Sequence, residues 1–119
     1  MKLLLAAFLA SAAAASPAQA ATPAPVVRLQ VVAHEYSFTL SRLRVHAGTA
    51  LIELDNMGQD PHDLRVQRIG AKHIAGLPVL KPGGRSILTL KLVPGRYSFW
   101  CSLANHRALG MVATLTVIR

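Results

Sequence analysis

Three residues with metal-binding side chains lie near the end of the chain, with four residues between each neighbouring pair. They are Cys101, His106 and Met111, and Cys101 is the only cysteine in the sequence. A thiolate, an imidazole and a thioether form a soft ligand set, which favours copper over magnesium, calcium or manganese. Apolar and polar residues alternate before Cys101 and after Met111, so the pattern places all three on a loop between two strands. This loop is therefore predicted to bind copper.

A trigonal copper site with a long axial thioether needs a second imidazole. His62 is the candidate, because it follows a turn of Asn, Gly, Asp and Pro residues at positions 56–61 and begins an alternating run. The period of two puts His62, Leu64 and Val66 on one face of the expected strand, and Asp63 on the opposite face with Arg65 and Gln67. We therefore expect His62 to point toward the core, on the same side as the apolar residues.

Two motifs resemble those of small blue copper proteins of the cupredoxin family, the plastocyanin and azurin group. They are the Asn-x-Gly-x3-His turn at 56–62 and the Gly-x-Tyr-x-Phe-x-Cys-x4-His-x4-Met run at 95–111. The spacing of the second motif is similar to the rusticyanin and sulfocyanin pattern. The resemblance implies one type 1 copper ion bound by His62, Cys101 and His106 with Met111 as the axial ligand. It also implies a carrier of single electrons that cycles between Cu(II) and Cu(I).

Two positions near the expected ligands raise questions that the resemblance leaves open. Many relatives have asparagine directly after the first histidine, where its side chain ties the two ligand loops together, whereas this chain has Asp63. An ionised aspartate accepts hydrogen bonds but cannot donate them, so the sequence does not decide whether Asp63 ties the two loops together. Trp100 precedes Cys101 and faces the opposite way. By resemblance it is a candidate electron path to the surface, and the alternative is a tryptophan packed under a neighbouring loop.

The first 20 residues have the features of a secretory signal peptide. Lys2 precedes an apolar run over 3–15, and the segment ends in Ala18-Gln19-Ala20, a typical cleavage sequence. The apolar run is shorter than the roughly 20 residues that span a bilayer, although an uncleaved anchor is the alternative. We expect a signal peptide at 1–20, a linker at 21–25, one domain at 26–119, and a periplasmic location.

The rest of the chain is rich in short runs with a period of two. Such runs, separated by turns at close spacing, predict an all-β antiparallel sandwich, and the resemblance implies its Greek-key cupredoxin form. The runs begin near positions 26, 36, 43, 50, 62, 87, 97 and 111. Residues 69–82 contain two glycines and two prolines and are predicted to form a looser segment instead of a strand.

The count of cysteines and histidines limits the alternatives. One cysteine cannot form an internal disulfide, and it rules out a binuclear copper centre with two bridging cysteines. A nucleophilic Cys–His pair is the enzymatic alternative, but it would leave His62 and Met111 unexplained, so we expect no enzyme activity. The other histidines lack partner spacing and are predicted to lie on the surface. They are His34, His46 and His73.

The chain is strongly basic, with 13 Lys and Arg residues, 5 Asp and Glu residues, and a net charge of +8, or +7 without Lys2. A scattered positive field favours an acidic redox partner or an anionic membrane surface. Export and the lack of an aromatic and basic stripe argue against nucleic acid. We expect a monomer without stable membrane insertion after cleavage. The alternative functions are copper delivery, storage or tolerance, and, more remotely, a cupredoxin-fold binding module that holds no metal.

Overall fold

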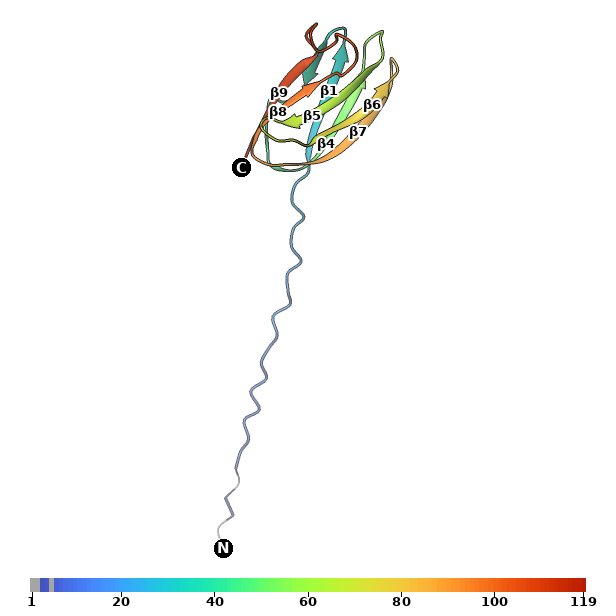
Figure 1. Cartoon of the computed structure of the whole chain (residues 1–119). Coiled ribbons are helices and arrows are strands. Elements are labelled where there is room, and N and C mark those ends of the chain that lie inside the picture. Colours follow the sequence, from blue (N-terminus) through green and yellow to red (C-terminus); the bar gives the residue numbers. More distant parts are fainter. Residues whose placement is uncertain (1–2, 5) are drawn as a thin grey trace.

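In the part of the chain that the structure describes, alternating apolar residues bring nine strands together in two stacked sheets (Figure 1). The computed structural model describes residues 3–4 and 6–119. One sheet has the order β2-β1-β4-β7 and the other β3-β9-β8-β5-β6, which confirms the predicted β-sandwich. The strands are β1 (Val27–His34), β2 (Ser37–Leu40), β3 (Arg44–His46), β4 (Gly48–Asn56), β5 (His62–Arg68), β6 (Ile74–Leu80), β7 (Arg85–Leu92), β8 (Gly95–Trp100) and β9 (Val112–Ile118).

The core lies between the two sheets and follows the period of two. Strand β4 contributes Ala50, Ile52 and Leu54, all fully buried, and strand β8 of the other sheet contributes Tyr97 and Phe99. Burying a large apolar side chain stabilises a fold by roughly 1.5–3 kcal/mol relative to leaving it exposed. These rows therefore hold the two sheets face to face and keep the ends of β5 and β8 in place.

Two of the strand pairs are parallel and the others are antiparallel. Strand β1 runs parallel to β4, with Val31 opposite Leu54, and β3 runs parallel to β9, with Val45 opposite Val117. Parallel neighbours cannot be joined by a tight hairpin, so the chain must cross between the sheets. These crossings bring the turns after β1, β4 and β8 to one end of the sandwich.

The prediction of a looser segment at 69–82 is wrong for half of its length, because Ile74–Leu80 forms β6. This strand lies at the edge of its sheet and pairs only with β5, and an edge strand tolerates Pro78. Gly76 is required by the pairing, since a Cβ there would lie 2.3 Å from the Leu64 carbonyl oxygen. The alternating run predicted to begin near position 43 starts one residue later as β3, and Leu43 is 68% exposed.

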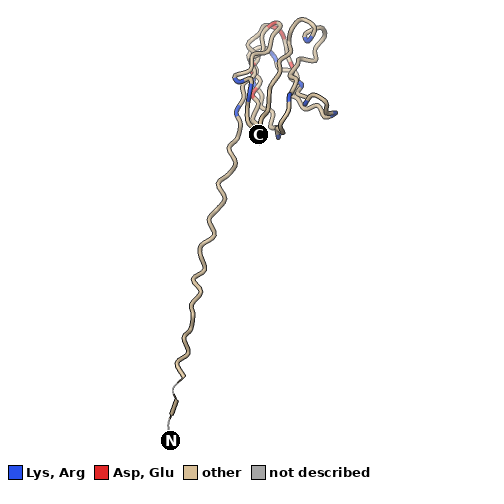
Figure 2. The backbone as a smooth tube through the Cα atoms, turned by 90° about the vertical axis from the view of Figure 1, so that its left-hand side faces the viewer, with Lys and Arg blue, Asp and Glu red and all other residues tan. Residues whose placement is uncertain are grey.

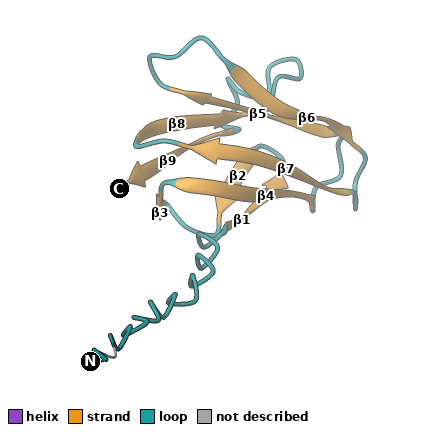
Figure 3. Cartoon of the chain, turned by 90° about the horizontal axis from the view of Figure 1, so that it is seen from below, coloured by secondary structure: helices purple, strands orange, loops and turns teal. Residues whose placement is uncertain are grey.

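The N-terminal segment trails away from the sandwich (Figures 1 and 3). Its described residues before Val27 have no regular secondary structure. Leu3, Leu4, Phe8 and Leu9 are 85–99% exposed, so their apolar side chains pack on nothing in the domain. Within the described part of the chain, no helix has the length and apolar character needed to cross a membrane.

Candidate metal centre

Three of the predicted ligands meet at one end of the sandwich. His62 Nδ1 lies 3.3 Å from His106 Nδ1, and Cys101 Sγ lies 3.5 Å from the same His106 nitrogen. One ligand atom from each residue lies within 4.8 Å of the others. His62 and Cys101 are fully buried and His106 is partly exposed. The structure therefore brings together residues that are 39 and 44 positions apart in the chain.

His62 is placed by the turn between β4 and β5. Asn56, the last residue of β4, holds this turn from inside. Its Nδ2 donates to the carbonyl oxygens of Asp60 at 2.9 Å and Leu80 at 3.0 Å, and its Oδ1 accepts the Gly58 N–H at 3.0 Å. Asn56 is fully buried and uses both ends of its amide, so its replacement would leave backbone groups without partners.

Met111 is tied to both neighbouring ligands through its backbone. Its N–H donates to the His106 carbonyl at 3.0 Å, and its carbonyl accepts the Cys101 N–H at 3.2 Å. The side chain of Met111 is fully buried and belongs to the same core cluster as Cys101. The loop over 101–111 is thus closed at its base, and the thioether lies inside the sandwich with the thiol.

The tie between the two ligand loops is present, with Asp63 accepting both bonds. Asp63 Oδ1 accepts the Ser102 N–H at 2.7 Å, and the Ser102 hydroxyl donates to Asp63 Oδ2. Asp63 shares a face of β5 with Arg65, as predicted, and its Oδ2 lies 3.4 Å from the Arg65 guanidinium. It is nevertheless only 1% exposed, and Ser102 of the other ligand loop is hydrogen-bonded to it. An aspartate, which only accepts hydrogen bonds, can therefore join the two ligand loops, because Ser102 supplies both donors.

The chemistry and spacing of these donors fit a copper ion. Metal–nitrogen bonds are about 2 Å long, so two nitrogen ligands of one ion lie roughly 3–3.5 Å apart. The His62 and His106 nitrogens already have this separation. Burial raises the pKa of the Cys101 thiol, so metal binding would displace a proton from sulfur. Two imidazoles, a thiolate and a buried thioether together match the type 1 copper donor set.

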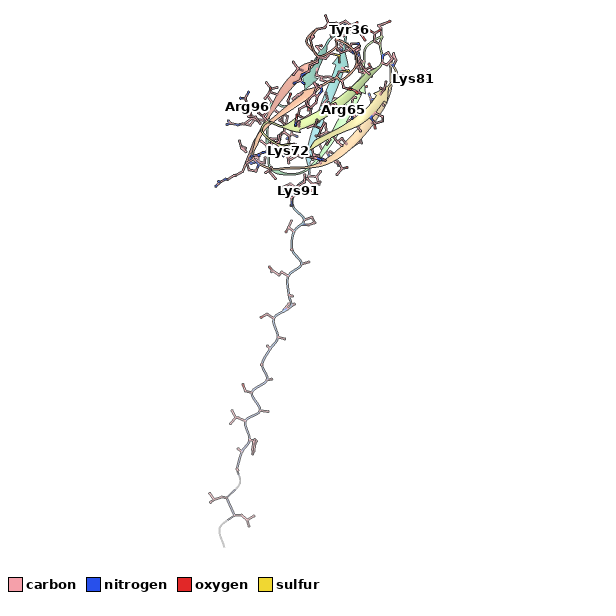
Figure 4. The ribbon with its side chains drawn as sticks, viewed as in Figure 1. Tyr36, Arg65, Lys72, Lys81, Lys91 and Arg96 are labelled. Atoms are coloured by element: carbon pink, nitrogen blue, oxygen red, sulfur yellow. The ribbon has the colours of Figure 1, made fainter. Side chains whose placement is uncertain are left out.

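The turn between β1 and β2 covers the ligands with two side chains that the sequence patterns missed. Glu35 Oε1 lies 3.0 Å from His62 Nε2, and the ring of Tyr36 has its centroid 4.8 Å from that of His106. The Tyr36 hydroxyl donates to Asp60 Oδ2 at 3.0 Å, which raises the pKa of Tyr36. Figure 4 shows Tyr36 at the end of the domain opposite the N-terminal segment. In the sequence, their only signal is a turn between two alternating runs.

Comparison with known proteins agrees with this geometry. The family model of the cupredoxin-like domain matches residues 3–115, which is nearly the whole chain. The chain belongs to the cupredoxin family. No curated protein sequence is significantly similar to this cupredoxin. Its donor set of His62, Cys101, His106 and Met111 accordingly matches a type 1 copper site.

Solved structures share the cupredoxin fold with this chain. Auracyanin from Roseiflexus castenholzii has 17% identity and a TM-score of 0.61, over 81% of this chain and 98% of that one. Rusticyanin from Thiobacillus ferrooxidans has 18% identity and a TM-score of 0.65, over 78% of this chain and 77% of that one. A multicopper oxidase has 18% identity and a TM-score of 0.59, over 77% of this chain but only 42% of its own. At these identities the likeness is one of fold.

Trp100 lies on the outer face of this cupredoxin, opposite to Cys101, as the alternation predicts. The Arg107 guanidinium carbon lies 4.7 Å from the centre of the Trp100 ring, which is a cation–π contact, and Arg65 is its cross-strand neighbour. Trp100 also lines a surface groove with Leu103 and Ala104. Arg107 of the ligand loop thus contacts the Trp100 ring, and both the packing role and the electron path stay predictions.

The remaining histidines lie apart from this group. His34, His46 and His73 are all exposed, as predicted, and His46 Nδ1 lies 2.6 Å from the carbonyl oxygen of Arg119. Within the part of the chain that the structure describes, the one cluster of metal-binding His, Cys, Asp and Glu side chains is that of His62, Cys101 and His106.

Proposed function

We propose that this cupredoxin carries single electrons between redox proteins, with His62, Cys101, His106 and Met111 as the ligands of its copper ion. The supporting observation is the convergence of His62, Cys101 and His106, whose ligand atoms lie within 4.8 Å of one another, with His106 Nδ1 at 3.3 Å from His62 Nδ1 and 3.5 Å from Cys101 Sγ. Copper, when bound there, supplies the one-electron Cu(II)/Cu(I) couple. The chain's own residues supply a frame that holds the donors in the same places in both oxidation states.

Rigidity of this frame is the main contribution of the fold. His62 starts β5, Cys101 follows β8, and Asp63 joins the two through Ser102. Because these groups are packed and hydrogen-bonded, a change of one charge at the metal moves them little, which favours fast electron exchange. Burial of His62 and Cys101 keeps water from the sulfur and one imidazole.

His106 is the route for electrons to the surface in this proposal, because it is the partly exposed ligand. Leu103 and Leu109 flank it, and Leu109 is 58% exposed. Ala104 and Ala108 are exposed nearby and complete a small apolar docking patch, with Arg107 beside it. The excess of 13 basic over 5 acidic residues suits an acidic redox partner and gives no reason to invoke nucleic acid. We propose that the protein acts as a monomer.

We further propose export to the periplasm, with a signal peptide at 1–20, a linker at 21–25 and the cupredoxin domain at 26–119. The composition of the first 20 residues and the exposure of Leu3, Leu4, Phe8 and Leu9 support this division. Mass spectrometry of the protein from a periplasmic extract tests it, with a mature form beginning at Ala21 as the expected result. A full-length protein in the membrane fraction would indicate a retained anchor.

We propose no catalytic role for the Cys101–His106 pair. An activated nucleophilic thiol has a lowered pKa and access to substrate. Cys101 has the opposite properties, because it is fully buried and burial raises its pKa. The 3.5 Å contact between Cys101 Sγ and His106 Nδ1 is better explained by two ligands that face one metal position.

The decisive experiment is an absorption spectrum of the copper-loaded protein together with its electron self-exchange rate. A visible thiolate-to-copper band and fast, reversible exchange are expected. Cys101→Ser should abolish the band, whereas the control His46→Ala, at an exposed histidine, should retain it. A band that persists in Cys101→Ser would reject the ligand set. Slow exchange with preferential transfer of Cu(I) to an acceptor would instead indicate copper delivery.

A further inference from the structure

One carboxylate oxygen of Glu35 accepts three hydrogen bonds beside the metal centre. Glu35 Oε1 lies 2.7 Å from the Gln59 nitrogen, 2.7 Å from the Asp60 nitrogen and 3.0 Å from His62 Nε2. The first two partners belong to the turn that delivers His62, and the third is the ring of His62 itself. Glu35, in the turn between β1 and β2, therefore contacts both His62 and the backbone of the turn between β4 and β5 that positions His62.

The turn is shaped to admit this carboxylate. A Cβ at Gly58 would lie 2.3 Å from Glu35 Oε1 and 2.9 Å from its Cδ, so any other residue there would push the side chain away. The side chain of Glu35 is 25% exposed while that of His62 is fully buried. The carboxylate thus lies between solvent and the buried imidazole.

Acidic residues are scarce in this chain and three of the five are placed around the ligands. Glu35 contacts His62, Asp60 accepts the Tyr36 hydroxyl, and Asp63 accepts two bonds from Ser102. Figure 2 shows acidic segments at the end of the sandwich away from the N-terminal segment. Asp63 also pairs with Arg65, whereas the ion-pair contact of Glu35 is with His62. Its negative charge is therefore directed at the ligand.

An ionised carboxylate only accepts hydrogen bonds, so its contact with His62 requires a proton on Nε2. In a neutral imidazole the other nitrogen, Nδ1, then carries the free lone pair. Nδ1 is the atom that faces His106 and belongs to the ligand cluster. A carboxylate behind a metal-bound imidazole also makes the ring a stronger donor, which favours the higher oxidation state of the metal.

We propose that Glu35 is a positioning residue, which holds His62 in the Nε2–H tautomer and whose charge lowers the reduction potential of the copper site. The claim about the reduction potential rests on the proposed copper function, whereas the claim about the His62 tautomer does not. The tautomer can be measured without copper, so the two parts can fail separately.

The first test compares the reduction potentials of the copper-loaded wild type, Glu35→Gln and Glu53→Gln. Glutamine keeps an acceptor oxygen and the size of the side chain, and Glu53 on β4 provides a control that removes the same charge elsewhere. Glu35→Gln is expected to shift the preference toward Cu(I) at least tenfold, which is about 59 mV for a one-electron couple. The control is expected to change it much less. Equal potentials in Glu35→Gln and wild type would overturn the charge effect.

The second test uses nitrogen NMR of the histidine rings in metal-free wild type, Glu35→Gln and Glu35→Ala. The wild type and Glu35→Gln are expected to show His62 protonated at Nε2, and Glu35→Ala a mixture of both tautomers. A pure Nε2–H tautomer in a folded Glu35→Ala would overturn the positioning role. If no thiolate-to-copper band forms in the wild type, the electron-carrier proposal fails, while this NMR result still decides the role of Glu35 toward His62.

Discussion

Asp63 Oδ1 accepts the Ser102 N–H at 2.7 Å, which joins the residue after one ligand to the residue after another. His62 and Cys101 are thereby linked across the two ligand loops by a buried carboxylate. Replacing Asp63 by alanine should lower the free energy of unfolding by about 1–3 kcal/mol, because both hydrogen bonds from Ser102 to a buried carboxylate are lost. Urea denaturation of the metal-free protein measures this, with Ser102→Ala as a milder control that keeps the N–H bond. An unchanged stability in Asp63→Ala would contradict the role of this tie.

Gly58 and Glu35 should behave as a single unit. Gly58→Ala is expected to displace the Glu35 carboxylate from His62 and the turn, because the added Cβ would lie 2.3 Å from Oε1. The double variant Gly58→Ala with Glu35→Ala should then lose little more stability than Glu35→Ala alone. Urea denaturation of the wild type, both single variants and the double variant gives the unfolding free energies for a double-mutant cycle. Additive losses would mean that Gly58 serves another purpose.

Met111 should tune the potential without being essential for the fold. Leucine is similar to methionine in size, so Met111→Leu is expected to cost less than about 1.5 kcal/mol of stability. Loss of the axial thioether removes a weak donor to Cu(II) and should raise the reduction potential while the thiolate-to-copper band remains. Voltammetry and the visible spectrum of the same sample measure both. Loss of the band would show that three ligands are insufficient to hold the metal.

Acid should remove the contribution of Glu35 to stability. Hydrogen bonds, chiefly from the Asp60 N–H, lower the pKa of Glu35 from 4.5 to about 2. A lowered pKa in the folded state means that the stabilisation is complete above about pH 4.5 and is lost as the pH falls through about 2. The stability difference between wild type and Glu35→Gln should therefore be larger at pH 6 than near pH 2. A difference that does not change with pH would contradict this shift.

Trp100 provides a test of a second electron path. If Trp100 carries electrons, Trp100→Leu should slow exchange with at least one partner while the copper spectrum is unchanged. Arg107→Leu removes the cation–π contact and leaves the ring, so it serves as the matched control. Unchanged exchange rates with every partner in Trp100→Leu would assign the ring to packing alone.

Features that depend on spacing along one strand or one loop could be predicted from the sequence. The period of two predicted the buried rows of β1, β4, β8 and β9, and the spacing of Cys101, His106 and Met111 predicted their loop, because neighbouring positions there are joined by short stretches of chain. The need for a second imidazole and the turn at 56–61 pointed to His62, which the fold brings to 3.3 Å from His106.

Contacts between segments that are distant in the sequence became visible only in the folded chain. Glu35 lies 27 positions before His62, and Asp63 lies 39 before Ser102. Their meeting depends on how the strands are ordered and how the two sheets stack, which no local pattern specifies. Strand β6 was missed for the same reason, since an edge position with one partner allows Gly76 and Pro78 in a strand. Ligand identity is thus a local property of the chain, whereas the surroundings that orient and tune the ligands arise from packing.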